Sequence, residues 1–196
     1  MNDKIRLIST EILSQHWGTL TRATLDYRRE DGTVQRLSRE NYDHGNAAAM
    51  ILFNPGRRTV LLVRQFRYPV LANGDAAFLL EACAGLLDGE DPQICARREA
   101  IEETGHEPAA MVHVGDVYMS PGSVQEKVSL FVGHYDESTY RHAGGGLIEE
   151  GEELEVVEMA LDEAMRACRD GRIVDGKTVI LLQYLCLGEM TMDRQA

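Results

Sequence analysis

The sequence predicts an α/β or α+β domain, and three observations support this class. Apolar runs of strand length recur along the chain, a few segments with helix signals lie between them, and 44% of the 196 residues are hydrophobic. This length and composition support one substantial core, or one core with a small appendage. We therefore expect a main domain over residues 46–196. Residues 1–45 are too few for a core of their own and are expected to form a small N-terminal β segment.

This N-terminal segment carries the signal of a β-hairpin. Residues 24–28 alternate between polar and apolar side chains, and residues 34–37 form a second short run of strand-forming residues. The dipeptide Asp31-Gly32, which favours tight turns, lies between them. The pattern predicts two antiparallel strands joined at this turn.

Strands dominate the expected main domain. Residues 47–53 and 59–66 are strongly apolar and are separated by Asn54-Pro55-Gly56, which predicts two strands of a buried sheet. Residues 72–77 predict a loop. Further strands are predicted at residues 112–119, 127–135 and 155–159.

Three helices are predicted in the same domain. Asp91 is a suitable N-cap, Pro92 suits the first helical position and Gly105 is placed to end the helix, so the first helix is expected over residues 91–104. The second begins near residue 161 and ends at Gly171, and the third begins near residue 175. Their apolar stripes predict inward-facing side chains at Leu161, Ala164, Met165 and Cys168, and at Val179, Leu182 and Cys186.

Charge and cysteine usage exclude several classes of partner. The formal net charge of -12 repels nucleic acid backbones and anionic membranes, so neither is expected as a partner. The four cysteines contain no CxxC pair, which disfavours a zinc site or a disulfide framework and favours buried free thiols. Residues 1–10 lack an apolar signal core, and no apolar run reaches transmembrane length. We expect a cytoplasmic protein.

The predicted helix at residues 91–104 carries the chemistry. Glu99, Glu102 and Glu103 stand at positions i, i+3 and i+4, which places three carboxylates on one helix face. Like charges so close repel each other, and Mg²⁺ relieves such repulsion because it prefers carboxylate and phosphate oxygens. A solvated acidic face is the alternative that this spacing alone leaves open.

The surrounding residues resemble the Nudix box. That motif has a glycine, five residues, a glutamate, seven residues and then Arg-Glu-apolar-x-Glu-Glu-x-Gly. Gly85 supplies the first glycine, and residues 98–105 match the second half without a mismatch. The spacing between them is one residue short, whether Glu90 or Asp91 is taken as the middle acid. The resemblance implies the mixed sheet of a Nudix α/β/α sandwich.

Nearly the whole chain is similar to the GDP-mannose pyrophosphatase subfamily of Nudix hydrolases, which shares the shortened box. The matching stretches are residues 46–67, 81–88, 118–122, 143–146 and 175–179. The resemblance implies Mg²⁺-dependent hydrolysis of GDP-mannose to GMP and mannose 1-phosphate, with Mn²⁺ as the alternative ion. It also implies a homodimer in which the N-terminal strands pack across the interface.

The same resemblance assigns roles to individual residues. Glu99, Glu103, Glu152 and the carbonyl of Ala84 are the implied metal ligands, and Glu102 is a near neighbour in the catalytic set. Glu152 is one of several acids in the glycine-rich loop, so a solvated loop residue is equally natural there. The residues implied to bind substrate, besides Ala84, Glu103 and Glu152, are Trp17, Ser38, Arg39, Glu40, Arg67, Gly85, Leu86, Glu126, Gly151 and Lys177.

The assignment of Trp17 has a plain structural alternative, as does the role expected for Arg98. Trp17 is expected to stack on a nucleobase, although it could simply cover apolar surface. Arg67 and Lys177 are expected on the ligand because arginine offers a planar fork for phosphate and lysine a point charge. Arg98 is expected to pair with a box carboxylate and hold the box loop in shape, or to form an ordinary surface ion pair.

Two other functions remain open at this point. An ADP-ribose pyrophosphatase, giving AMP and ribose 5-phosphate, shares the Ser120-Pro121-Gly122 element and the Ala84-Gly85-Leu86-x-Asp88 entry to the box. A catalytically silent Nudix ligand sensor is disfavoured because the three box glutamates are all present.

Overall fold

The computed structural model describes residues 3–148, 151 and 153–193, with side chains described up to Gly188. The chain divides into two compact units. The first comprises Met1–Asn46 together with Tyr118–Lys127, and the second comprises Ala47–Val117 with Val128–Ala196.

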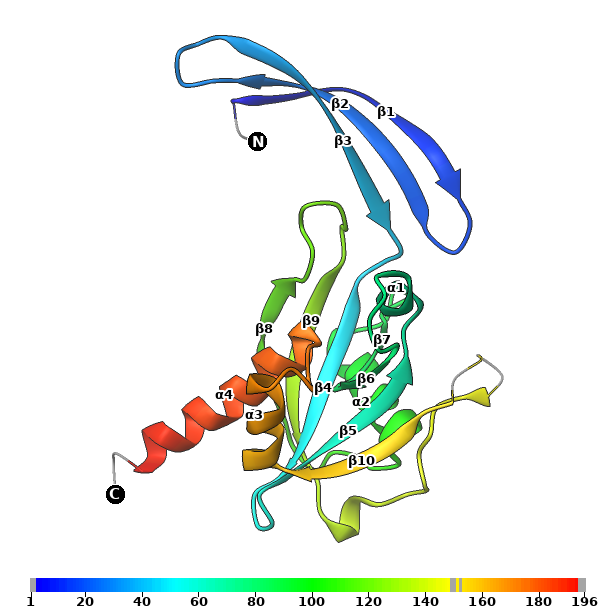
Figure 1. The fold of residues 1–196 in the computed structure, drawn as a ribbon, viewed down its shortest axis with the longest axis vertical. Helices are drawn as coiled ribbons and strands as arrows, with labels where there is room; N and C mark the ends of the chain where they lie inside the picture. Colours follow the sequence, from blue (N-terminus) through cyan, green and yellow to red (C-terminus); the bar gives the residue numbers. More distant parts are fainter. Residues whose placement is uncertain (1–2, 149–150, 152, 194–196) are drawn as a thin grey trace. The chain divides into compact units, whose positions relative to one another are not determined.

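The first unit is a three-stranded antiparallel sheet in the order β1-β2-β3 (Figure 1). Its strands are β1 Ile5–Gln15, β2 Thr19–Arg28 and β3 Val34–Asp43. The predicted hairpin is confirmed: Arg28 pairs with Val34, and Gly32 has a φ of 82° in the turn between them. Both strands are longer than predicted, and β1 was not predicted at all.

Strand β1 was missed because its sequence does not alternate regularly. Its register against β2 shifts between Leu7 and Ser9 and again between Ile12 and Ser14, which marks β-bulges. A bulge changes which side chains share a face. Leu7 pairs with Leu25 and Ile12 with Thr21, so the first shift brings Leu7 and Ile12 onto the same face of the sheet.

The second unit is built on a seven-stranded mixed sheet in the order β10-β5-β4-β9-β8, with β6 beside β5 and β7 beside β4. The strands are β4 Ala47–Asn54, β5 Thr59–Phe66, β6 Phe78–Glu81, β7 Cys83–Leu86, β8 Met111–Tyr118, β9 Lys127–His134 and β10 Glu155–Ala160. Strand β4 is buried throughout and runs parallel to β9, while it pairs antiparallel with β5 and β7. The predicted α/β class with a mixed sheet is confirmed.

Helices cover both faces of this sheet. Ala48, Met50 and Leu52 of β4 share a buried cluster with residues of α2 Pro92–Thr104. The alternating residues Ala49 and Ile51 therefore face the opposite side, where α3 Leu161–Arg169 and α4 Gly176–Asp193 contact β5 and β4. Figure 1 shows α3 and α4 on the near side of β4 and β5, with α2 behind them.

The prediction of which residues of α3 and α4 are buried was partly wrong. In α3 the buried residues are Leu161, Ala164 and Ala167, while Met165 and Cys168 are half-buried. In α4 Leu182 is buried, but Val179 and Cys186 are half-buried. The buried set in α4 is Thr178, Leu181, Leu182 and Leu185. This helix is apolar on most sides, so periodicity could not select its buried face. No helix in the described ranges is long and apolar enough to span a bilayer.

The sequence also missed the short elements between β5 and α2. Helix α1, Tyr68–Ala72, precedes the predicted loop and includes its first residue. Strands β6 and β7 have four residues each and carry no period-2 alternation long enough to recognise. They are strands because they pair with β5 and β4, and this pairing places Ala84 and Gly85 on a strand that contacts α2.

Candidate functional site

Helix α2 starts and ends at the predicted residues. The side chain of Asp91 accepts hydrogen bonds from the backbone N–H groups of Gln93 and Ile94, at 2.9 and 3.4 Å. Gly105 ends the helix with a φ of 76°. A Cβ atom at Gly105 would lie 1.8 Å from the carbonyl oxygen of His142, so only glycine fits there. Both ends of the helix that carries the box glutamates are therefore fixed.

The box glutamates do not form a solvated face. Glu99 is 8% exposed and Glu103 is 1% exposed, while Glu102 is half-buried. Glu99 lies directly against β7: a Cβ atom at Gly85 would fall 1.8 Å from its Oε1 atom. The glycine that opens the box is therefore needed for the close approach of this carboxylate to the strand.

The predicted pairing of Arg98 with a box carboxylate is confirmed, and the residue contacts three of them. Its Nη1 atom lies 2.9 Å from Glu99 Oε1 and 2.9 Å from Glu102 Oε2, and its Nε atom lies 3.3 Å from Glu90 Oε2. Asp91 serves as the helix cap instead. Glu90, and not Asp91, is therefore the middle acid that takes part in the box.

Burial and the negative charge of these carboxylates raise the pKa of two nearby cysteine thiols. Burial raises the pKa of the Cys83 thiol well above its ordinary value, and the charges of Glu103 and Glu99 raise it further. Burial and the charge of Glu99 likewise raise the pKa of Cys95 to about 11. Both thiols are therefore protonated at neutral pH and are not nucleophiles. Cys83 and Cys95 are both free thiols, and both are buried.

The glycine-rich segment predicted as a loop begins against the C-terminal end of α2. The N–H of Gly145 donates to the carbonyl of Glu103 at 2.8 Å, and the N–H of Gly146 donates to that of Glu102 at 3.2 Å. Gly144 has a φ of 71°, and a Cβ atom there would lie 2.5 Å from the carbonyl oxygen of Glu103. The segment thus caps the helix end through backbone contacts that require glycine.

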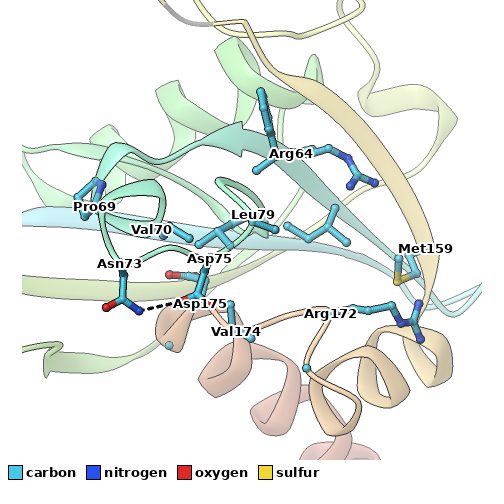
Figure 2. Close-up of a pocket in the computed structure, with 15 residues that line it drawn as sticks. Arg64, Pro69, Val70, Asn73, Asp75, Leu79, Met159, Arg172, Val174 and Asp175 are labelled. Carbon is cyan, nitrogen blue, oxygen red and sulfur yellow. Dashed lines mark hydrogen bonds between the residues drawn. The ribbon is translucent and has the colours of Figure 1, made fainter.

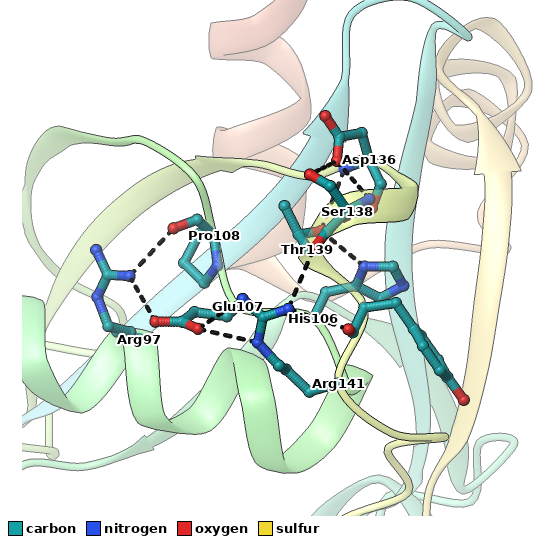
Figure 3. A network of polar contacts seen from close by, with 9 residues as sticks. Arg97, His106, Glu107, Pro108, Asp136, Ser138, Thr139 and Arg141 are labelled. Atoms are coloured by element: carbon teal, nitrogen blue, oxygen red, sulfur yellow. Dashed lines mark hydrogen bonds and ion pairs between the residues drawn. The ribbon is translucent and has the colours of Figure 1, made fainter.

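A polar network braces the same helix end (Figure 3). Arg97 Nη1 donates to the carbonyl of Pro108 at 3.1 Å and lies 3.6 Å from Glu107. Arg141 pairs with the same Glu107 carboxylate at 3.0 Å. His106 Nδ1 lies 2.9 Å from Thr139 Oγ1, and the His106 ring packs edge-on against Tyr135. His106 therefore has a structural role.

Arg67 and Lys177 meet on a buried acid that the sequence did not single out. Arg67 donates to both oxygens of Glu81, at 2.8 and 3.0 Å. Lys177 Nζ donates to Glu81 Oε2 at 2.5 Å and to Asp175 Oδ1 at 2.9 Å. Glu81 is 1% exposed. An acid in the otherwise apolar stretch at residues 78–84 was the available signal, because buried carboxylates are almost always paired.

Five further predicted ligand contacts, Trp17, Ser38, Arg39, Glu40 and Glu126, lie in the first unit, whereas Leu86 and Gly151 belong to the second. Trp17 is 72% exposed, and its ring stacks on that of His44 at a centroid distance of 5.0 Å. On β3, Ser38 and Glu40 point to one face of the sheet, and Arg39 points to the other. The strand brings Ser38 and Glu40 together but separates Arg39 from them.

Glu126 belongs to the segment that includes the Ser-Pro-Gly element. This segment is bound to the end of β3: the N–H of Tyr42 donates to the carbonyl of Ser123 at 2.8 Å, and that of Gln125 donates to the carbonyl of Tyr42 at 3.0 Å. The side chain of Gln125 also bonds Asn41 and Asp43. The backbone around Glu126 is thereby fixed within the first unit.

The metal set predicted from the sequence is only partly described. Glu152 lies outside the described residues, as do its neighbours Glu149 and Glu150. Over the described ranges, no three His, Cys, Asp or Glu side chains are grouped closely enough to hold a metal ion by themselves. Glu99 and Glu103 still present hard oxygen donors at one edge of β7, which fits Mg²⁺ provided that further oxygens complete its shell.

A separate cavity of about 1010 Å³ lies on the α3–α4 side of the sheet (Figure 2). Its lining is mixed, with Arg64, Arg172 and Asp175 beside Leu79 and Val174. Neither Glu99 nor Glu103 lines it. The cavity therefore borders the charged cluster at Asp175 but lies apart from the box carboxylates.

The fold and the box define a Nudix protein, and the comparison with family models agrees. The chain belongs to the Nudix family, because the NUDIX domain model matches residues 43–181. A second model, described as the GDP-mannose pyrophosphatase NudK N-terminal domain, matches residues 4–42.

Individual relatives are similar over nearly the full length. A GDP-mannose pyrophosphatase of Escherichia coli O1:K1 / APEC is 44% identical over 191 residues, which cover 97% of this chain and 99% of the relative. One from Cronobacter sakazakii is 46% identical over 188 residues, covering 95% and 97%. The crystal structure of an ADP compounds hydrolase matches with a TM-score of 0.72 at 19% identity, covering 98% and 97%, and supports the fold.

Proposed function

We propose that this chain hydrolyses the diphosphate bond of a nucleotide-sugar, converting GDP-mannose to GMP and mannose 1-phosphate. The main structural support is the buried pair Glu99 and Glu103, held against the β7 edge where Gly85 leaves room for the Glu99 carboxylate. The choice of GDP-mannose is supported by relatives of that name at 44% and 46% identity over almost the whole chain.

The proposed cofactor is Mg²⁺, with Mn²⁺ as the alternative. Glu99, Glu103, the Ala84 carbonyl and Glu152 would hold it. A bound divalent ion neutralises charge on the diphosphate and lowers the pKa of an attacking water. A protein of net charge -12 repels an anionic ligand. A cation bound by the buried acids would offset this repulsion at the site.

The chain's own residues would bind and orient the substrate. Arg67 is 38% exposed at its side chain and would donate to a phosphate oxygen. Trp17, exposed and stacked on His44, would accept a nucleobase on its open face. Glu152 would orient the attacking water. The other proposed substrate contacts are Ser38, Arg39, Glu40, Ala84, Gly85, Leu86, Glu103, Glu126, Gly151 and Lys177.

We also propose a homodimer formed through residues 1–45, with residues 46–196 as the hydrolase domain. Its support is the apolar face of the first unit, where Leu7 and Ile12 are each 62% exposed. A cytoplasmic location is proposed because Cys83 and Cys95 are free thiols, and thiols persist in a reducing compartment.

The decisive experiment compares substrates. Purified full-length protein is given GDP-mannose or ADP-ribose with Mg²⁺, and products are identified by chromatography. We expect kcat/KM for GDP-mannose to exceed that for ADP-ribose, and EDTA to abolish turnover. Preference for ADP-ribose would replace the substrate assignment.

A second arm separates an enzyme from a ligand sensor. Glu103→Gln is expected to lose at least about 100-fold in kcat, because it removes a charged ligand of the proposed metal ion. Wild-type turnover by this variant at saturating Mg²⁺ would contradict the assigned site. Tight binding of GDP-mannose by the wild type without any hydrolysis would favour the sensor.

A further inference from the structure

Glu81 is a buried carboxylate at the end of β6 to which the proposed reaction assigns no role. It is 1% exposed and accepts three hydrogen bonds, two from Arg67 and one from Lys177. Burial acts to raise the pKa of Glu81, but the bonds from Arg67 and the charge of Lys177 outweigh it, and the net shift is downward. Glu81 is therefore ionised at neutral pH.

A second acid braces the same cluster from the start of α4. Asp175 Oδ1 accepts from Lys177 Nζ at 2.9 Å, and Asp175 Oδ2 accepts from the backbone N–H of Thr178 at 3.0 Å. The hydroxyl of Thr178, buried at 0% exposure, accepts from the N–H of Ala82 at 2.7 Å. Ala82 directly follows Glu81, so the α4 terminus and the β6–β7 backbone are locked together around it.

This arrangement leaves one edge of Arg67 open. Its Nε and Nη2 atoms are engaged with Glu81, and Nη1 makes no hydrogen bond to the described part of the chain. The side chain is 38% exposed, whereas that of Glu81 is 2% exposed. Burial acts to lower the pKa of Arg67, but Glu81, Glu103 and Asp175 raise it. The guanidinium thus lies within the electrostatic reach of a box glutamate.

Stability alone is a poor explanation for such a cluster. Burying charged pairs costs about as much desolvation free energy as their attraction returns, so apolar residues would serve a core equally well. A fixed pair of cations, with Arg67 in the electrostatic reach of Glu103, is useful where an anionic ligand must meet them without rearrangement.

We propose that Glu81 is a positioning residue for the substrate diphosphate. It holds the Arg67 guanidinium by its Nε–Nη2 edge so that the Nη1 edge meets a phosphate oxygen, and it ties Arg67 to Lys177. This inference rests on the proposed function and adds a residue to it. Glu81 acts through Arg67 and does not touch the ligand.

The test compares two Glu→Gln variants of the full-length protein. Glu81→Gln keeps the shape but removes the charge that orients Arg67. The control is Glu158→Gln, because Glu158 also binds three groups, on Arg57, Thr59 and Tyr135, but at the Thr59 end of β5, away from Arg67. We expect Glu81→Gln to raise KM for GDP-mannose about tenfold or more, with a smaller change in kcat. Glu158→Gln should change KM less than about twofold.

A double variant distinguishes positioning from general damage. If Glu81 acts through Arg67, Glu81→Gln combined with Arg67→Gln should have the same KM as Arg67→Gln alone. Additive losses, or an unchanged KM in Glu81→Gln, would overturn the proposal. If Glu81→Gln does not fold, Glu81→Asp replaces it. Aspartate keeps the charge but shortens its reach, and KM should rise severalfold.

Binding measured without turnover separates this inference from the proposed function. Calorimetry with the methylene-bridged analogue of GDP-mannose needs no hydrolysis. Binding that is about tenfold weaker in Glu81→Gln than in Glu158→Gln supports positioning even if the wild type proves inactive. Equal affinity of the two variants, or no binding by the wild type, rejects it.

Discussion

Gly85 and Glu99 show how a single residue choice decides whether the site exists. The glycine stands on β7, and the carboxylate of Glu99 occupies the space that a side chain at Gly85 would fill. The φ of Gly85 is not in the left-handed region, so close packing and not backbone freedom requires a glycine there. The first glycine of the box is therefore part of the geometry of its acids.

Gly85→Ala is predicted to cut kcat about 10- to 100-fold, because Glu99 must move by an ångström or more to admit the methyl group. The measurement is steady-state kinetics with GDP-mannose. The matched control is Gly188→Ala in α4, where an added Cβ meets nothing within 4 Å. Full activity in Gly85→Ala would show that Glu99 need not lie where the structure places it.

The ion pairs of Glu81 also make the folding stability of the protein depend on pH in the acid range. Its pKa in the folded protein lies below the ordinary value of 4.5, despite burial, because Arg67 and Lys177 favour the charged form. A depressed folded pKa stabilises the protein fully above the unfolded pKa, and this contribution is lost as pH falls through the folded pKa.

We therefore expect the melting temperature of Glu81→Gln to lie below that of the wild type by a constant amount near neutral pH. The gap should shrink as pH falls below about 4.5, where Glu81 of the unfolded wild type becomes protonated. Thermal unfolding followed by circular dichroism at pH 3 to 8 measures this. A gap that widens on acidification would contradict the assigned ion pairs.

At the scale of elements, α2 is a helix whose two ends are both capped by specific contacts. Asp91 caps its first turn, and Gly105 with the segment at residues 144–146 closes its last turn. Because the box glutamates occupy the last two turns, their backbone is held by these contacts as well as by the core beneath. The glycine-rich segment is thereby coupled to the helix before it reaches the acidic loop.

Asp91→Ala is predicted to destabilise the protein by about 1 kcal/mol, the usual free-energy loss when an N-cap is removed. It should leave kcat/KM for GDP-mannose unchanged, since Arg98 pairs with Glu90 and not with Asp91. Denaturant unfolding and kinetics on the same preparation test both parts. A large loss of activity with normal stability would instead identify Asp91 as the middle acid of the box.

At the scale of the whole molecule, the first unit carries an exposed apolar face, on which Leu7 and Ile12 are each 62% exposed. Leu7 and Ile12 share this face through the β1 bulge, and Leu25 and Leu37 continue it on β2 and β3. Exposed apolar strands of this kind favour pairing with another chain. This is the physical basis for the proposed homodimer.

If the proposed dimer forms, replacing both Leu7 and Ile12 by lysine should convert it to a monomer, because two desolvated charges would face the partner. Light scattering on the full-length protein measures the mass, and the doubly substituted Arg29→Lys/Arg36→Lys protein controls for changes elsewhere in the sheet. A wild type that is monomeric at micromolar concentration would remove the basis for the dimer.

The sequence by itself determined the features that rest on local chemistry. Helix α2 with its caps, the strands β4 and β5, and the placement of three glutamates on one helix turn follow from spacing, capping residues and apolar runs. These preferences act over a few residues and survive in any fold that contains them.

Only the tertiary structure decided the rest. Strands β6 and β7 exist because β5 and β4 pair with them, and β1 is aligned by bulges that appear only against β2. Glu81 became visible as a partner of Arg67 and Lys177, because 96 residues separate it from the lysine. Pairing, burial and ion contacts between distant segments depend on the folded chain, so no local pattern encodes them.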